Sequence, residues 1–431
     1  MTTTTPPVTR APAPAPDLPD FRSREVLLAH ARHTMDFYHP RCVDPSGGFF
    51  HCFRDDGSVY DAHQRHLVSS TRFVFTYAMA YRRFGDTAYL DGVRHGVRFL
   101  REAHFDDALR GYAWLLDWRD GQAQVLDGTR HAYGLAFVLL AYAHAAMAGV
   151  DEARPWIAET FALMEERFWD EAAGLYADEA SPQWHVLSPY RGQNANMHAC
   201  EALLAAFDAT GERRYLARAA LLAQHITRRQ AERCGGLIWE HYDAHWQPDW
   251  LYNRDDPANL FRPWGYQPGH FTEWTKLLLQ LEARAEHLDQ DLGWVLPTAT
   301  KLFLVAVRHG WDAGHGGLCY SLAPDLSICD PDKYFWVQAE SAAAAARLAA
   351  RTGDGVYWDW YQRLWAYSWT HFVDHAHGAW YRILDGENRK YSDEKSPPGK
   401  VDYHTMGACY DIVDVLDGVG MRRVDQGARD A

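Results

Sequence analysis

The sequence predicts an all-α protein whose helices form an (α/α)6 barrel, and two observations lead to this prediction. First, a glycine followed by apolar and aromatic residues recurs six times along the 431 residues, at Gly48, Gly111, Gly174, Gly236, Gly317 and Gly378. Second, the stretches between these glycines are rich in Ala, Leu and Arg at helical spacing, and each is long enough for two helices. Six helical hairpins of this kind are expected to close into a ring.

The spacing of the six glycines defines the repeat. Successive glycines lie 63, 63, 62, 81 and 61 residues apart. A nearly constant period is typical of repeat architectures, in which each unit needs its neighbours to bury its apolar face. We therefore expect one catalytic barrel domain over residues 21–420, although the length alone would allow two or three domains.

Each repeat is expected to contain a helix, a tight turn, a second helix, a short strand-like turn and a long loop. Gly85, Gly211 and Gly353 are predicted to end helices in the left-handed conformation. The acidic residue after each of them is predicted to lie in the first turn of the next helix, where it favours the helix dipole. Tight turns and long loops then fall on opposite rims, and function is expected on the long-loop rim.

The enlarged step between Gly236 and Gly317 holds about 19 additional residues, by comparison with the other steps. Much of this excess is expected in segment 246–269, which is rich in aromatic and charged residues. Long loops of this kind are often functional. The segment is interpreted as a lid or as an oligomer contact, and the sequence does not distinguish the two.

Both ends are expected to lie outside the barrel. Residues 1–20 are rich in Thr, Pro and Ala and lack an apolar h-region, which predicts a disordered tail and not a signal peptide. Residues 421–431 are expected to form a C-terminal tail. The seven cysteines are scattered and form no CxxC pair, so a reduced cytoplasmic protein is favoured over a disulfide framework or a zinc site.

The amino-acid composition indicates which kind of molecule the protein binds. A formal net charge of −14 argues against nucleic acids and anionic membranes, and no run approaches 18 apolar residues. The 18 Trp, 23 Tyr and 19 Phe serve mainly in barrel packing, but several are expected to line a pocket for a sugar. The expected partner is a small monosaccharide, and the expected assembly is a monomer or a homodimer.

Polar residues recur where each helix begins after a long loop. Because the same place in each repeat recurs around a ring, these side chains are expected to converge on one axial pocket. They are Arg72, His131, Tyr133, Asn194, His198, His270, Glu273, Trp336, Gln338, Glu340 and His404. A single buried histidine is more often a satisfied core residue than a catalytic one, but six repeats with polar groups at one position favour a site.

Two of these histidines precede a glutamate by one helical turn: His198 precedes Glu201, and His270 precedes Glu273. The pairs read either as metal ligands or as acid/base histidines that a carboxylate orients. We favour the second interpretation, because no third ligand with metal spacing is visible near either histidine. Neither a metal nor another cofactor is therefore expected.

Other chemistries have less support. The nucleophile elbow, the phosphate-binding loop and the dinucleotide fingerprint are all absent from the sequence. A glycoside hydrolase on an α/α barrel remains an alternative, since acidic residues are plentiful, but it needs a facing pair of carboxylates where histidines dominate here. A non-catalytic sugar-binding barrel is a second alternative, although it would be expected to lack the two histidines.

Taken together, these motifs resemble the N-acylglucosamine 2-epimerase superfamily over about residues 21–420. The resemblance rests on Arg72 after Ser-Thr, Gly111-Tyr112-Ala113-Trp114, Asn194 with His198, Gly269-His270 with Glu273, Trp336 through Glu340, and Tyr403-His404. The stretch from Trp380 to His404 is most similar to the mannose isomerase branch. The resemblance implies an (α/α)6 barrel that interconverts reducing sugars without a metal.

The resemblance also implies roles for individual residues. The two acid/base histidines correspond to His270 and His404. The substrate-orienting residues correspond to Arg72, Tyr112, Asn194, His198, Glu273 and Trp336. Gly399 stands where cellobiose epimerases place a tryptophan that stacks on a second sugar, so a disaccharide substrate is not expected.

These roles lead to a mechanistic hypothesis. His404 removes the proton at C2 of the open-chain sugar, and His270 handles ring opening and the oxygen protons. Arg72 stabilises the enediolate, Glu273 orients His270, and Trp336 stacks on the sugar. Return of the proton to C1 gives isomerisation of mannose to fructose, and return to the other face of C2 gives epimerisation. The sequence leaves both outcomes open.

Overall fold

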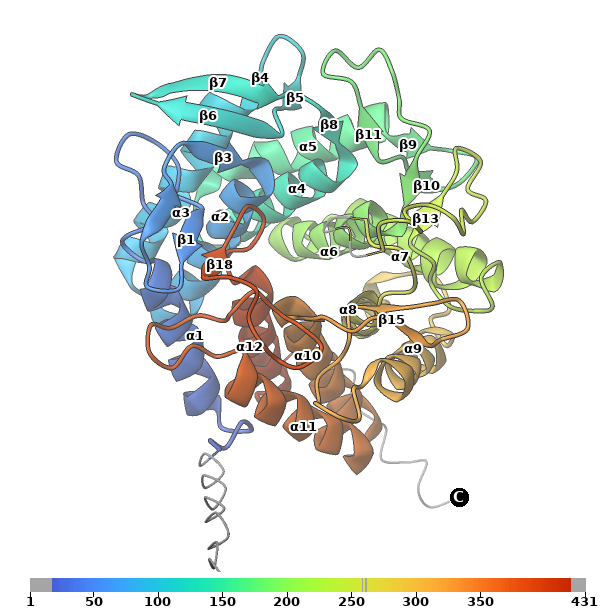
Figure 1. The fold of residues 1–431 in the computed structure, drawn as a ribbon. Coiled ribbons are helices and arrows are strands. Elements are labelled where there is room, and N and C mark those ends of the chain that lie inside the picture. Colours follow the sequence, from blue (N-terminus) through green and yellow to red (C-terminus); the bar gives the residue numbers. More distant parts are fainter. Residues whose placement is uncertain (1–17, 258, 260–261, 420–431) are drawn as a thin grey trace, which may run out of the picture.

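The computed structural model describes residues 18–257, 259 and 262–419, and helices make up most of it (Figure 1). Within these residues the α-helices are α1 (Arg24–Tyr38), α2 (Leu67–Phe84), α3 (Thr87–Phe99), α4 (Ala132–Met147), α5 (Arg154–Arg167), α6 (Gln193–Thr210), α7 (Arg213–Gln224), α8 (Pro268–Glu282), α9 (Val295–Gly310), α10 (Phe335–Thr352), α11 (Gly355–His371) and α12 (Tyr403–Leu416). Shorter helical turns are Leu100–His104, Asp151–Ala153, His225–Gln230 and Ala285–His287. The prediction of a mostly helical chain is confirmed.

The even-numbered helices form an inner ring. Each of them packs against the next, from α2 through α4, α6, α8 and α10 to α12, and α12 packs against α2 (Figure 1). The odd-numbered helices lie outside, and each covers one inner helix. The first helix, α1, covers the last, α12, so the two ends of the chain make the sixth hairpin. This cycle of contacts is the arrangement that an (α/α)6 barrel requires.

Burial follows this division into two rings. The inner helix α10 is buried along most of its length, with the small residues Ala342–Ala346 at its centre. The outer helix α3 buries only one face, with Tyr89, Val93 and Val97 inward, as its amphipathic sequence requires. Inner helices therefore have polar residues only where a partner or the cavity accepts them.

The tight turns between inner and outer helices have the predicted backbone. The glycines at positions 85, 211 and 353 are left-handed, with φ of 72°, 73° and 72°, and each N–H bonds the carbonyl four residues earlier. The acidic residues lie one position earlier than expected. Asp86 and Asp354 are N-caps whose side chains accept from the amides two residues on, because those amides have no partner within the helix.

Short antiparallel strands connect neighbouring repeats at the loop rim. The strand that leads into an inner helix pairs with a strand of the following repeat. The pairs are β3 (Gln64–His66) with β6 (Leu115–Arg119), β8 (Arg130–His131) with β11 (Glu179–Ala180), β12 (Arg191–Gly192) with β13 (His241–Tyr242), β16 (Lys333–Tyr334) with β17 (Ile383–Leu384), and β18 (Glu394–Ser396) with β1 (Cys52–Arg54). Before α8, a single bridge between Tyr266 and Leu322 takes this place. The strand pairs thus close the same cycle as the helices.

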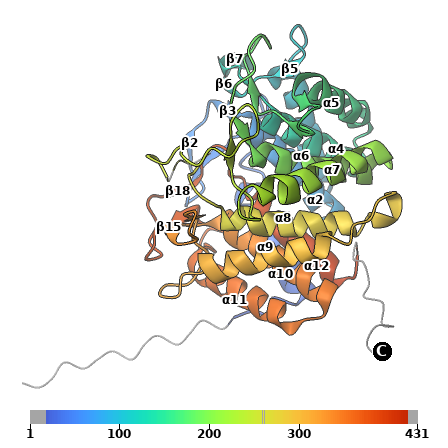
Figure 2. The same ribbon diagram turned by 90° about the vertical axis from the view of Figure 1, so that its right-hand side faces the viewer.

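The remaining strands lie within repeats. They are β2 (Val59–Asp61), β4 (Phe105–Asp106), β5 (Gly111–Tyr112), β7 (Gln122–Asp127), β9 (Trp169–Asp170), β10 (Leu175–Tyr176), β14 (Ser321–Leu322) and β15 (Ile328–Asp330). The strand-like turns expected after Gly111 and Gly174 are β5 and β10. The longer hairpin of β6 and β7 was not predicted. Seen from the side, strands and long loops gather at one end of the helices (Figure 2).

The additional residues of the enlarged step lie in two places. The loop into α8 is long, as expected, but α8 already begins at Pro268, inside the predicted segment 246–269. The second place is the connection 283–294 between α8 and α9, where the other tight turns at 85–86, 211–212 and 353–354 need two residues. The long loop before α8 agrees with the expectation that it holds much of the excess, and the connection 283–294 was not predicted.

The expected tails lie mostly outside the described residues, which begin at 18 and end at 419. Packing of the barrel begins at Phe21, whose ring stacks on Trp365 at a centroid distance of 5.0 Å. In the described part of the chain, no helix combines the length and the apolar composition that crossing a membrane requires.

Candidate active site

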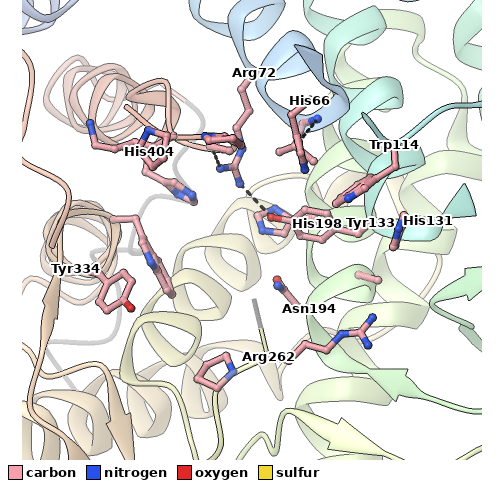
Figure 3. A pocket seen from close by; sticks show the side chains of 18 of the residues that line it. His66, Arg72, Trp114, His131, Tyr133, Asn194, His198, Arg262, Tyr334 and His404 are labelled. Carbon is pink, nitrogen blue, oxygen red and sulfur yellow. Dashed lines mark hydrogen bonds between the residues drawn. The ribbon is translucent and has the colours of Figure 1, made fainter. Parts of the chain in front are cut away.

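A cavity of about 610 Å³ lies where the N-terminal turns of the inner helices meet the long loops. Every inner helix contributes a polar or aromatic side chain to its wall, and Figure 3 labels Arg72, Tyr133, Asn194, His198 and His404 among them. These residues are Arg72 on α2, Tyr133 on α4, Asn194 and His198 on α6, His270 and Glu273 on α8, Trp336 on α10 and His404 on α12. The predicted convergence on one pocket is confirmed for all of them. The volume is in the range of small-molecule sites.

His404 is held by a buried carboxylate that is itself held by a lysine. Nδ1 of His404 lies 2.7 Å from Oε1 of Glu340, and Oε2 of Glu340 accepts from Nζ of Lys276 at 2.5 Å. Burial, with the charges of Arg72 and Lys276 adding to it, holds the pKa of His404 well below its ordinary value. The imidazole is therefore neutral near pH 7, and its Nε2 is available to take a proton.

His270 has a different partner. Its Nδ1 lies 3.0 Å from Oε2 of Glu240, and the amide of Gln193 donates to the same carboxylate oxygen at 2.9 Å. Trp274 fixes that amide by donating to its oxygen at 2.7 Å. The expectation that Glu273 orients His270 is thus wrong, because the carboxylate at hydrogen-bond distance from the imidazole belongs to Glu240.

The indole of Trp336 contacts both histidines. Its centroid lies 5.1 Å from that of His270 and 5.7 Å from that of His404. The ring packs on the backbone of Gly269, where a Cβ atom would come within 2.5 Å of it. Gly269 is therefore needed for the indole to sit beside the two imidazoles.

Arg72 brings a positive charge to the same wall. Its guanidinium donates to the carbonyl of Gly399 at 2.5 Å and to the hydroxyl of Tyr133 at 3.2 Å, and it lies over the ring of Phe137. These contacts fix a group that stays charged at all relevant pH values. A developing negative charge on a ligand oxygen would be stabilised beside it.

Glu273 and Asn194 offer unused hydrogen-bonding capacity to the cavity. Among the described residues, neither carboxyl oxygen of Glu273 has a hydrogen-bond partner, and neither does Oδ1 of Asn194. Burial, with the charges of Glu340 and Glu201 adding to it, raises the pKa of Glu273 well above its ordinary value. Buried polar atoms without partners are rare in native proteins, so these groups are suited to ligand hydroxyls.

A cluster of carboxylates connects His198 to His404. Nδ1 of His198 lies 3.0 Å from Glu201, as the sequence spacing predicted, and 4.0 Å from Glu273. Two sets of three groups have ligand atoms within 4.8 Å of one another: His198, Glu201 and Glu273, and also Glu273, Glu340 and His404. The expectation that no third ligand lies near His198 is therefore wrong, because Glu273 comes from a neighbouring helix.

Protein donors already occupy much of this cluster. Lys276 donates to Glu340, and the hydroxyl of Tyr403 donates to Glu201. Burial would raise the pKa of Glu201, but the hydrogen bond from His198 and the charge of Lys276 hold it below its ordinary value. A buried ammonium thus stands where a metal cation would otherwise balance the carboxylates.

With this geometry in view, known proteins show what the chain is related to. The sequence profile of the N-acylglucosamine 2-epimerase (GlcNAc 2-epimerase) family matches residues 48–408. The chain belongs to the N-acylglucosamine 2-epimerase family. The resemblance expected from the sequence motifs is thereby confirmed.

Several members of this family are similar over nearly the whole chain. A D-mannose isomerase from Marinomonas mediterranea is 53% identical over 399 residues, which cover 92% of this chain and 99% of that protein. A D-mannose isomerase from Thermobifida fusca is 39% identical, over 84% of this chain and 87% of that protein. A crystal structure of D-mannose isomerase, 53% identical, matches with a TM-score of 0.88 over 92% of this chain and all of that one. The prediction of an enzyme of the isomerase class is confirmed by these relatives.

Tyr112 does not line the cavity, although the family resemblance implies a substrate-binding role for it. Its hydroxyl lies 2.9 Å from that of Tyr142 and accepts from Arg101 at 3.3 Å. Trp114, from the same motif, lines the cavity instead. Its ring centroid lies 4.0 Å from that of His131 and 4.5 Å from that of His66. In a regular strand residues 112 and 114 would share a face, but β5 ends at Tyr112 and Trp114 lies in the connection to β6, so the two rings face different surroundings.

Gln338, which repeat position also placed in the pocket, has a structural role. Its amide accepts from the N–H of Leu318 and donates to the carbonyl of the same residue, at 2.9 and 2.8 Å. Asn196 makes the matching pair of bonds to Tyr176 two repeats earlier, at 2.8 and 3.0 Å. These side chains fix the Gly-aromatic turns to the inner helices.

Asp178 lines the cavity of this protein, although the sequence analysis did not predict it. It follows Leu175-Tyr176 in the third repeat and accepts from the amide of Gly192 at 2.6 Å. Burial raises its pKa to about 7. In the second, fifth and sixth repeats too, a residue shortly after the repeat glycine lines the cavity, namely Trp114, Tyr320 and Arg382, and that position is the signal that would have indicated Asp178.

Gly399 stands at the position where the sequence resemblance implied that a second sugar finds no tryptophan to stack on. It lines the cavity within Pro397–Lys400, donates from its amide to Ser69 at 2.7 Å and has φ of +90°. A tryptophan at this position would be strained in that conformation. The left-handed backbone at position 399 of this chain therefore favours glycine.

Proposed function

We propose that this enzyme interconverts free D-mannose and D-fructose through a cis-enediolate within an (α/α)6 barrel. The observation that carries the proposal is the pair of cavity histidines, His404 and His270, each with its Nδ1 against a buried carboxylate and both in contact with Trp336. The sugar is inferred from the relatives named D-mannose isomerase, which are 53% and 39% identical.

The first half-reaction removes the proton at C2 of open-chain mannose. Because Nδ1–H of His404 is directed at Glu340, the lone pair of Nε2 accepts this proton. The electron pair of the C2–H bond forms the C1=C2 double bond, and the carbonyl electrons move to O1. Arg72 stabilises the resulting negative charge. His270 supplies a proton to O1, having first assisted opening of the ring.

The second half-reaction completes the transfer. His270, which has given its proton to O1, takes the proton from O2, the C2=O2 carbonyl of fructose forms, and the electron pair of the double bond takes the proton at C1 from His404. No atom is gained or lost, and the enzyme returns to its starting protonation state. The unpartnered oxygens of Glu273 and Asn194 bind sugar hydroxyls, together with His198, and Trp336 stacks on the sugar.

The assignment of Tyr112 as a substrate contact is not carried into this proposal, because its hydroxyl is engaged with Tyr142 and Arg101. Metal-independent catalysis is retained, on the ground that Lys276 and Tyr403 already donate to the carboxylate cluster. A cytoplasmic location and a monomeric or homodimeric state are also proposed. The seven cysteines are all free in the structure, as a reducing compartment requires.

A mannose 2-epimerase is the second candidate, because return of the proton to the opposite face of C2 starts from the same enediolate. The purified protein should be incubated with mannose in heavy water, and the early products separated and analysed for deuterium. Fructose with deuterium at C1 and little glucose is the expected result. Glucose labelled at C2 as the main early product would identify the epimerase, and cellobiose as the preferred substrate would refute the monosaccharide assignment.

A further inference from the structure

Lys276 lies too deep in the cluster to be explained by solubility or surface charge. It is on α8, one turn after Glu273, and its side chain is only 8% exposed. Its ammonium donates to Glu340 at 2.5 Å. A buried ion pair contributes little to stability compared with apolar packing, so its presence beside the catalytic histidine calls for a chemical reason.

The geometry gives the two oxygens of Glu340 separate tasks. Oε2 accepts from Lys276, and Oε1 lies 2.7 Å from Nδ1 of His404. A proton shared between Oε1 and Nδ1 decides the tautomer of the imidazole. If it resides on Nδ1, then Nε2 has a free lone pair; if it resides on Glu340, Nδ1 must accept and Nε2 must hold a hydrogen.

We infer that Lys276 is a positioning residue that keeps His404 in the Nδ1–H tautomer by keeping Glu340 ionised. This inference rests on the proposed function, in which Nε2 of His404 is the base. The ammonium occupies Oε2 and favours the carboxylate, which then accepts the Nδ1–H bond. Without that positive charge, three neighbouring carboxyl groups would compete for protons in a buried site.

The other groups around Glu340 make this charge important. Burial raises the pKa of Glu340, Glu201 and Asp411 raise it further, and Lys276 opposes them. Of the other charged groups here, Arg72 comes from α2 and is bound to Gly399, and Arg347, also on α10, bonds Asp411 at 2.7 Å. His198 on α6 is bound to Glu201. Lys276 thus brings a positive charge into direct contact with Glu340.

His270 provides an internal contrast. Its carboxylate, Glu240, accepts from the neutral amide of Gln193, and Trp274 fixes that amide. An amide orients the carboxylate without adding a positive charge. Nε2 of Gln193 also lies 3.0 Å from Nδ1 of His270, so a neutral amide stands beside both that imidazole and its carboxylate, whereas a lysine stands beside the carboxylate of His404.

The test is a direct measurement of the tautomer in the full-length protein labelled with ¹⁵N-histidine. Long-range ¹H–¹⁵N spectra distinguish Nδ1–H from Nε2–H, and the His404→Asn variant assigns the signal. Wild-type protein is expected to show Nδ1–H. Lys276→Met and Glu340→Gln are expected to show Nε2–H at His404, and Lys276→Arg, which keeps the charge, is expected to restore Nδ1–H.

The matched control is Lys395→Met. Lys395 also makes a fully buried ion pair, with Asp374 at 2.6 Å, but that pair contacts the carbonyl of Gly378 and not a catalytic histidine. Its loss is expected to leave the His404 signal unchanged. Should Lys276→Met fail to fold, Lys276→Gln is neutral yet still donates to Glu340, and it is expected to show the same Nε2–H tautomer.

Kinetics supply a second readout. Lys276→Met is expected to lower kcat by about tenfold or more with a smaller change in KM, since it impairs the base and not binding. Lys276→Met made in the Glu340→Gln variant is expected to lower kcat little further, because both substitutions act by changing the tautomer of His404. A His404 signal that stays Nδ1–H in Lys276→Met would overturn the inference. If the His404 tautomer switches in the variants as expected but the wild-type protein forms no fructose from mannose, the proposed function is refuted and the inference about Lys276 stands.

Discussion

Nδ1 of His270 lies 3.0 Å from Oε2 of Glu240, although the two residues are 30 positions apart and only His270 lies on an inner helix. Replacement of Glu240 by Gln should therefore lower kcat by about tenfold or more, because the amide no longer stabilises a protonated imidazole. KM for mannose should change less. Glu282→Gln is the control, since Glu282 is equally buried on α8 but pairs with Arg351 away from the cavity. Equal effects of the two substitutions would contradict the role of Glu240.

Replacement of either catalytic histidine should nearly abolish turnover. His404→Ala and His270→Ala should each reduce kcat by about 10²–10⁴-fold while the circular dichroism spectrum is retained. His225→Ala serves as the comparison, because His225 bonds the carbonyl of Gly174 outside the cavity. A folded His404 or His270 variant with most of its activity would show that the residue has been assigned the wrong role.

The stability of the protein should depend on pH through Glu273. Its pKa in the folded state lies well above the ordinary value of 4.5, so the folded protein keeps a proton that the unfolded chain releases. Stability is therefore lost as pH rises above about 4.5, and Glu273→Gln avoids this loss. The melting temperature of the wild type relative to the variant should fall as the pH rises above about 5.

For Glu201 the pH dependence of stability is expected to have the opposite sign. Hydrogen bonding and the charge of Lys276 hold its pKa below the ordinary value against the effect of burial, so its contribution to stability is present at neutral pH and is lost on acidification. Glu201→Gln should accordingly have a lower melting temperature than the wild type near pH 7, and the difference should shrink toward acid. A common sign for the Glu201 and Glu273 variants would show that the pKa values of the two carboxyls are not shifted in opposite directions.

Removal of metal ions should leave the enzyme active. The carboxylates near His198 and His404 already accept from Tyr403 and Lys276, so a cation is not needed to balance them. Dialysis against a strong chelator should not change the rate of fructose formation. A loss of activity that one divalent metal restores would instead identify one of the two three-residue clusters as a metal centre.

The sequence predicted those features that repeat. Arg72, His198, His270 and His404 were located correctly at the cavity because a fixed position in each repeat maps to a fixed place in the ring. The partner of His270 could not be found in this way. Glu240 belongs to a loop of the previous repeat, and the nearby Glu273 satisfied the expected helical spacing just as well.

Contacts between different helices were the second feature that could not be predicted from the sequence. Glu273 lies near His198, Glu340 and His404, on three other helices, and no periodicity within one helix reveals such a cluster. The direction of Tyr112 was likewise undetermined, since a two-residue strand gives too little alternation to show which side chain faces the cavity. Repeat position predicts the neighbourhood of a residue, whereas its partner depends on packing.

The pairing of α1 with α12, and of β18 with β1, has a consequence for biosynthesis. A ribosome releases the helices in order, and until the final segment emerges α2 and α10 each lack the neighbour that covers them. His404 is on α12, so the nascent chain has no complete active centre before α12 has been synthesised. A circular permutant that joins the native ends and opens one of the exposed two-residue turns, such as 211–212, would change this order and supply His404 earlier.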